Sequence, residues 1–156
     1  MFSSFGSGFE QYDPVYFEDV EAKLRQFEWR IGSTILVYGS VARFGCGHDL
    51  DVIIVGTEEM WKEFKELVLE EVEEVGRLGA WIRQSVVHSM LGHAFTTLKD
   101  ESLALIDVYI FPPDWEKRLD ELQRAFPHED PNFMMNICRD TKTLGQCSIE
   151  AARMSC

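Results

Sequence analysis

The stretch VYGSVARFGCGHDLDVIIV, residues 37–55, joins two hydrophobic segments through a glycine-rich loop, and two aspartates lie where the second segment begins. In a β-strand, successive side chains point to opposite faces. Asp49 and Asp51 are therefore predicted to share one face, while Leu50 and Val52 point into the core. Two carboxylates held so close repel each other and are costly to remove from water, so they need solvent or a cation between them.

The residues before the aspartates are suited to hold a phosphate group. Gly39 has no side chain to block an approach to the backbone, and Ser40 offers a hydroxyl and an amide at the expected start of a short helical turn. Arg43, one turn further on, can add a charged group to the same phosphates. Hard divalent cations such as Mg²⁺ bind carboxylate oxygens and keep positions open for substrate phosphates. The pattern therefore predicts a place for a metal-bound triphosphate.

The composition predicts a single globular domain, residues 1–156. The chain has 46% hydrophobic and 27% charged residues and is long enough to bury a core. No apolar run is long enough to cross a membrane, and the first residues lack the layout of a secretory signal, so we expect a cytoplasmic protein. A net charge of -12 with scattered basic residues disfavours tight nonspecific binding of nucleic acid.

The cysteines form no C-x-x-C pair and are too few to frame a domain of this size, so we expect free thiols. The equal spacing of the last three leaves a metal site as an alternative. The four positions are Cys46, Cys138, Cys147 and Cys156.

Hydrophobic periodicity predicts the elements around the opening stretch. Apolar residues at helical spacing indicate a helix over residues 14–30, and short apolar runs indicate strands over 34–38 and 50–55. Thr57 is suited to cap a following helix, in which the acidic run at 70–74 is expected to form a solvated face. The opening dozen residues, rich in glycine, serine and phenylalanine, are expected to be irregular or docked on the surface.

The second half of the chain is predicted to contain three further strands and a helix. The strands are expected at residues 81–88, 94–98 and 103–111, the last two forming a hairpin across the sequence KDES. Asp114 is suited to cap the helix that follows. From residue 131 onward, a short helix and a weakly patterned tail are expected.

Together these elements predict an α/β (α+β) fold, with a mixed β-sheet of about five strands and helices packed on one side. The core is expected to span about residues 14–126, with a C-terminal helix and tail over 127–156. Such a fold alone does not decide a function.

The run YGS followed by DLDV is similar to the signature of the DNA polymerase β-like nucleotidyltransferase superfamily, and GSVAR resembles the minimal nucleotidyltransferases in particular. The resemblance covers about residues 14–126 and implies a mixed sheet with a third carboxylate on a later strand. Asp107, in SLALIDVYIF, is the candidate for that carboxylate. From the residues alone, Asp107 is equally a core aspartate with satisfied oxygens or a metal ligand. The resemblance favours the ligand.

The resemblance also implies a role for each of these residues. Asp49 and Asp51 would bridge two Mg²⁺ ions, for which Mn²⁺ is a possible substitute, and Asp107 would bind the catalytic ion and help deprotonate the acceptor hydroxyl. The residues implied to hold the nucleoside triphosphate are Gly39, Ser40 and Arg43. The implied reaction is attack of an acceptor hydroxyl on the α-phosphate of a nucleoside triphosphate, such as ATP, with release of pyrophosphate.

Some features leave the acceptor and the activity open. Only eight residues separate Ser40 from Asp49, so the loop must be tight, and His48 occupies a position where the family often has serine. With no large added domain expected, a small molecule or a protein is favoured over an RNA end as the acceptor. One alternative is a catalytically silent relative that binds a partner protein, like an antitoxin. Another is a domain that senses metal or nucleotide. A protein partner or a homo-oligomer is compatible with each.

Overall fold

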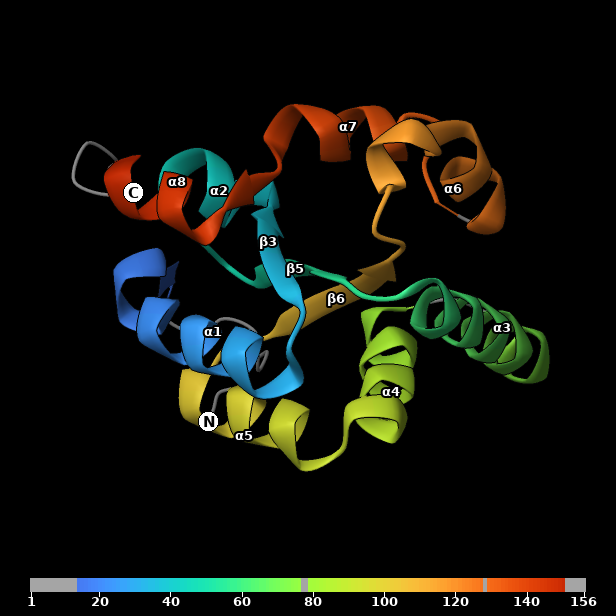
Figure 1. Cartoon of the computed structure of the whole chain (residues 1–156), viewed down its shortest axis with the longest axis horizontal. Helices are drawn as coiled ribbons and strands as arrows, with labels where there is room; N and C mark the ends of the chain where they lie inside the picture. The colour runs from blue at the N-terminus through green and yellow to red at the C-terminus, as the bar shows by residue number, and fades with distance from the viewer. Residues whose placement is uncertain (1–13, 77–78, 128, 151–156) are drawn as a thin grey trace, which may run out of the picture.

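A four-stranded mixed β-sheet lies at the centre of the computed structural model, which describes residues 14–76, 79–127 and 129–150 (Figure 1). Across the sheet, the strands are β6 (Ile106–Phe111), β5 (Leu50–Val55), β3 (Thr34–Tyr38) and β7 (Lys142–Thr143). β3 pairs antiparallel with β5 and β7, whereas β5 pairs parallel with β6. The expectation for the opening dozen residues falls outside the described residues.

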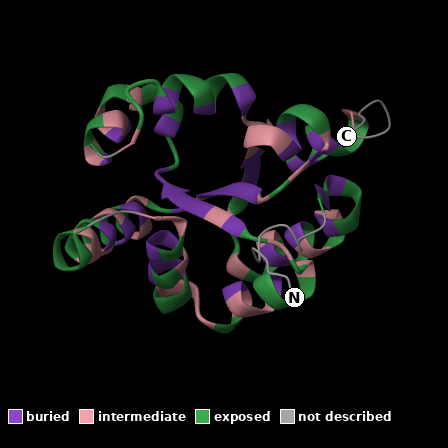
Figure 2. Cartoon of the chain, turned by 180° about the vertical axis from the view of Figure 1, so that it is seen from behind, coloured by how far each residue is buried: buried purple, intermediate pink, exposed green. Residues whose placement is uncertain are grey.

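The two strands of the opening stretch are confirmed with the predicted bounds, 34–38 and 50–55. They pair along their whole length, from Thr34 opposite Val55 to Tyr38 opposite Asp51. Both consist largely of branched apolar residues, which pack well in a sheet that is covered on both faces. Figure 2 shows these central strands as largely buried.

One side of the sheet is covered by α1, α4 and α5 (Figure 1). The ring of Phe27 in α1 packs against that of Phe95 in α5, with centroids 6.3 Å apart. The expected first helix is confirmed from Phe17 onward, whereas Val15 and Tyr16, expected within it, form the short strand β2 (Val15–Tyr16). The helix ends where Gly32 adopts a left-handed conformation with a φ of 66°. The bounds are α1 (Phe17–Ile31), α4 (Ala80–Leu91) and α5 (His93–Ser102).

The other side of the sheet carries α2, α6 and α7, at the top of Figure 1. Their bounds are α2 (Gly39–Phe44), α6 (Leu119–Ala125) and α7 (Phe133–Asp140). The rings of Phe126 and Phe133 lie 5.2 Å and 5.1 Å from the ring of Tyr109 in β6, measured between centroids. The α+β class is therefore confirmed, but helices cover both sides of the sheet rather than one.

The connection from β5 to β6 differs most from the prediction. It begins with α3 (Glu58–Val75), and the Thr57 side chain accepts a hydrogen bond of 3.1 Å from the amide of Met60, as expected of a cap. The segments 81–88 and 94–98, expected to be strands, are the helices α4 and α5. Buried residues recur there at helical intervals, and a parallel pair of strands requires such a crossover in place of a hairpin.

The segment after β6 corrects two smaller expectations. The strand expected over 103–111 is shorter, since β6 begins at Ile106. Asp114 caps no helix; it precedes a short 3-10 helix, η2 (Trp115–Lys117), and accepts a hydrogen bond of 3.1 Å from Arg118.

The C-terminal part of the chain completes the sheet and core. The expected short helix is confirmed as α7, and the segment expected to be a weakly patterned tail forms β7 and α8 (Leu144–Glu150). Ile137, Leu144 and Cys147 belong to the same core as the central strands.

The expectation of free thiols is wrong at Cys46, which is disulfide-bonded. Spacing along a chain does not reveal which cysteines the fold brings together. Cys138 and Cys147 are free, as expected. None of the described helices combines the length and the apolar composition needed to cross a membrane.

We expect Phe126→Ala to lower the free energy of unfolding by about 3–5 kcal/mol, because the buried ring packs against Phe64, Tyr109 and Phe133. Denaturant unfolding followed by circular dichroism measures the loss. Trp29→Ala is the control: its side chain is 82% exposed, so the change should stay within about 0.5 kcal/mol. A loss below about 1 kcal/mol for Phe126→Ala would contradict the packing described.

Candidate functional site

The parallel pairing of β5 with β6 places Asp51 directly opposite Asp107. Paired residues on neighbouring strands point to the same face of the sheet, so these two carboxylates are neighbours although 55 residues follow Asp51 before Asp107. Asp49 precedes β5; its charge acts on Asp51, and the charge of Asp107 acts on Asp49. The structure therefore brings together all three aspartates singled out in the sequence.

Burial and mutual repulsion make Asp49 and Asp51 hard to ionise in the absence of a cation. Asp51 is only 9% exposed, and burial followed by the charges of Asp49 and Asp107 raises its pKa to about 8. Burial also raises the pKa of Asp49, and the charge of Asp107 adds to the effect. Arg83 opposes the shift at Asp51. A positive charge between these groups would relieve the repulsion.

Gly39 and Gly47 allow the closest contacts around the aspartates. Gly39 begins α2 with a φ of 72°, and a Cβ atom at this position would overlap the Asp51 carboxylate. A Cβ atom on Gly47 would overlap the hydroxyl of Ser40. Gly47 belongs to β4 (Cys46–Gly47), which pairs antiparallel with β2 (Val15–Tyr16). The tight loop expected before Asp49 is thus built by close backbone approaches that only glycine permits.

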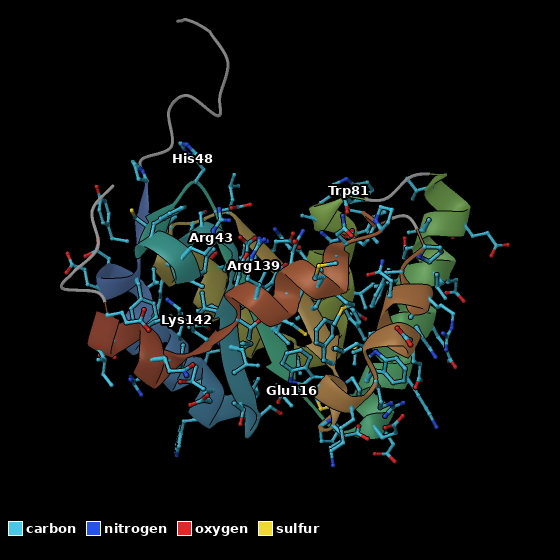
Figure 3. The ribbon with its side chains drawn as sticks, turned by 90° about the horizontal axis from the view of Figure 1, so that it is seen from above. Arg43, His48, Trp81, Glu116, Arg139 and Lys142 are labelled. Carbon is cyan, nitrogen blue, oxygen red and sulfur yellow. The ribbon has the colours of Figure 1, made fainter. Side chains whose placement is uncertain are left out.

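Arg43, unlike Gly39, makes no contact with the aspartates that the structure records. It is exposed, its guanidinium lies 4.8 Å from the ring of Phe44, and it makes no ion pair with any residue that the structure describes. Seen from above in Figure 3, Arg43 and Arg139 lie near each other, with His48 further out. Arg139 belongs to α7 and forms an ion pair of 2.9 Å with the neighbouring Asp140.

Arg83 is a residue of the candidate site that the sequence did not indicate. Its side chain reaches from α4 to Asp107, and Nε and Nη2 both donate to the same oxygen, Oδ1, over 2.9 Å and 2.8 Å. The guanidinium also lies 4.5 Å from the centroid of the Tyr109 ring. An arginine beside Ile82 in an apolar run could have indicated a buried charge. The expectation of a strand over 81–88 hid this feature.

The donor chemistry of the site suits Mg²⁺, since three carboxylates supply the hard oxygen ligands that this ion prefers. In the described part of the chain, however, no group of three or more His, Cys, Asp or Glu side chains is already arranged to hold a metal ion. One oxygen of Asp107 is engaged by Arg83. Metal binding at these residues therefore requires a rearrangement of side chains.

Comparisons with models of protein families, with curated proteins and with solved structures return no match to this chain.

We expect Gly39→Ala to be much more destabilising than Gly32→Ala. Both glycines have a positive φ, so alanine costs about 1–2 kcal/mol of backbone strain at either position. Only at Gly39 does the new Cβ also collide with Asp51, whereas Gly32 has open space around it. Thermal or denaturant unfolding measures both variants. Equal losses would contradict the close approach of the Asp51 carboxylate to the backbone.

We expect Asp51→Asn to stabilise the metal-free protein progressively as the pH rises. Because the folded state raises the pKa of Asp51 from 3.8 to about 8, it binds a proton more tightly than the unfolded chain does, so stability falls across this pH window. Asparagine removes that loss. Between pH 5 and pH 8 the advantage of the variant should grow by about 1 kcal/mol or more, measured by unfolding in EDTA. A constant difference would contradict the environment described for Asp51.

Proposed function

We propose that this protein is a metal-dependent nucleotidyltransferase, which moves a nucleoside monophosphate from a nucleoside triphosphate to an acceptor hydroxyl. The observation that supports this most is the register that sets Asp51 opposite Asp107 on parallel strands. Asp49 and Asp51 lie close enough for their charges to repel, and the Gly39 backbone lies against Asp51. Carboxylates gathered beside the backbone are what a metal-bound triphosphate requires.

In this proposal Asp49, Asp51 and Asp107 hold the Mg²⁺ ions, which supply positive charge to the phosphates and to the leaving oxygen. Gly39, whose backbone lies against the Asp51 carboxylate, and Ser40, through its hydroxyl, would hold the phosphates. The acceptor oxygen forms a bond to the α-phosphorus, while the bond from that phosphorus to the bridging oxygen breaks. Pyrophosphate leaves with the bonding electrons, and the acceptor proton passes to the Asp107 carboxylate.

A small molecule is the acceptor that we favour. A cavity of about 360 Å³ lies along α4 and α5, a size suited to such a ligand. Its lining includes Gln84, which donates a hydrogen bond to the carbonyl of Ile106, the residue before Asp107. Trp81, half exposed in the same lining, offers a ring for stacking.

A second candidate function has an observation of its own. The two hydrogen bonds from Arg83 engage the carboxylate on which the reaction would depend, and the described residues hold no ready group of metal ligands. Both features would also suit a catalytically silent protein that keeps the fold and binds a partner. This candidate requires neither metal binding nor turnover.

We expect the purified protein, given Mg²⁺, each α-labelled nucleoside triphosphate and a panel of hydroxyl-bearing acceptors, to release pyrophosphate and label an acceptor. Asp51→Asn should reduce the rate by about 100-fold or more, because loss of metal-borne charge stabilisation costs several kcal/mol. Asp120→Asn is the matched control, since Asp120 is an exposed aspartate on α6.

The two candidates give opposite results in this assay. Pyrophosphate release that needs Mg²⁺ and Asp51, and that survives in Asp120→Asn, supports the enzyme. Calorimetry on the same samples measures the binding of metal and of nucleotide. Binding of neither would contradict the enzyme and favour the catalytically silent partner-binding protein.

A further inference from the structure

Arg83 is the single buried cationic side chain among the residues that the structure describes, and it lies in an acidic site. Its side chain is 6% exposed. Although Nε and Nη2 could each engage a different oxygen, both donate to Oδ1 of Asp107. In the metal-free protein, Arg83 is therefore the positively charged partner of the Asp107 carboxylate.

The third nitrogen of Arg83 points to a second acceptor. Nη1 is buried and has no hydrogen-bond partner within the described part of the chain. It lies 3.6 Å from Oε1 of Glu129, which is too long for a hydrogen bond but close enough for an ion pair. A buried donor without a partner is costly, so a small movement of the guanidinium toward Glu129 would be favourable at that end.

We propose that Arg83 is a positioning residue that competes with the metal ion for Asp107 and transfers its hydrogen bonds to Glu129 when the ion binds. This inference rests on the proposed function. A divalent cation beside Asp107 repels the guanidinium and needs carboxylate oxygens that Arg83 engages. Glu129 already faces Nη1, so the arginine keeps a buried partner after it leaves Asp107. The exchange is the side-chain rearrangement that metal binding requires here.

The competition predicts opposite effects on metal affinity for two variants. Arg83→Gln removes the competing charge and should bind Mn²⁺ about 10-fold more tightly than the wild type, within the usual range of coupling between two sites. Glu129→Gln removes the charged acceptor that receives Arg83 and should bind Mn²⁺ about 3- to 10-fold more weakly. Calorimetric titration with Mn²⁺ alone, on the full chain, measures both without any assay of turnover.

An ion pair elsewhere in the chain provides the matched controls. Arg118 forms an ion pair of 2.9 Å with Glu121, so Arg118→Gln and Glu121→Gln remove the same kinds of charge from another part of the molecule. Both should leave Mn²⁺ affinity within about twofold of the wild type. Equal changes in Mn²⁺ affinity in the control and test variants would show that only net charge matters, and would overturn the inference.

The remaining outcomes separate this inference from the proposed function. If neither the wild type nor Arg83→Gln binds Mn²⁺, both proposals fail. If the wild type binds Mn²⁺ and Arg83→Gln binds it equally or more weakly, the competition is overturned and the proposed function stands. If circular dichroism shows that Arg83→Gln is unfolded, Glu129→Gln decides: weaker binding supports the inference, and unchanged binding overturns the transfer to Glu129.

Discussion

The parallel pairing of β5 with β6 determines the architecture of the candidate site, because it sets Asp51 opposite Asp107. Parallel strands cannot be joined by a tight turn, so the chain must cross back over the sheet. Here the crossover is made of α3, α4 and α5. One of these helices, α4, lies beside β6 and carries Arg83 to Asp107. The same connection thus builds the carboxylate pair and supplies its countercharge.

The cluster of aspartates lowers the stability of the folded protein, and its surroundings offset part of that loss. Burial and like charges oppose the ionisation of Asp51, while Gly39 allows its carboxylate to lie against the backbone. The rest of the core compensates: Phe126 and Phe133 cluster around Tyr109, two residues beyond Asp107 in β6. Strongly shifted groups beside a well-packed core are typical of sites shaped for binding or catalysis rather than for stability.

The sequence alone was sufficient for the features with strong local signals. Short runs of branched residues identified β3 and β5. The shared face of Asp49 and Asp51 stays a prediction, because Asp49 lies before β5. The helices α4 and α5 were missed because Trp81, Ile82, Val86 and Val87 also suit a strand, and only the helical spacing of their burial separates the two. The role of Arg83 beside Asp107 was missed because of the same error. The covering of both faces of the sheet depends on contacts between distant segments, which local patterns do not contain. The spacing of the cysteines likewise did not indicate the disulfide at Cys46.

We propose that Asp51 and Asp107, paired across β5 and β6, form a divalent-cation site for a nucleoside triphosphate. The most direct test is the anomalous scattering of Mn²⁺ in crystals of the wild-type protein grown with Mn²⁺ and a non-hydrolysable nucleoside triphosphate. The account predicts an anomalous peak bound by both carboxylates, with the phosphates beside Gly39. A map in which these carboxylates hold no Mn²⁺, while Arg83 still engages Asp107, would contradict it.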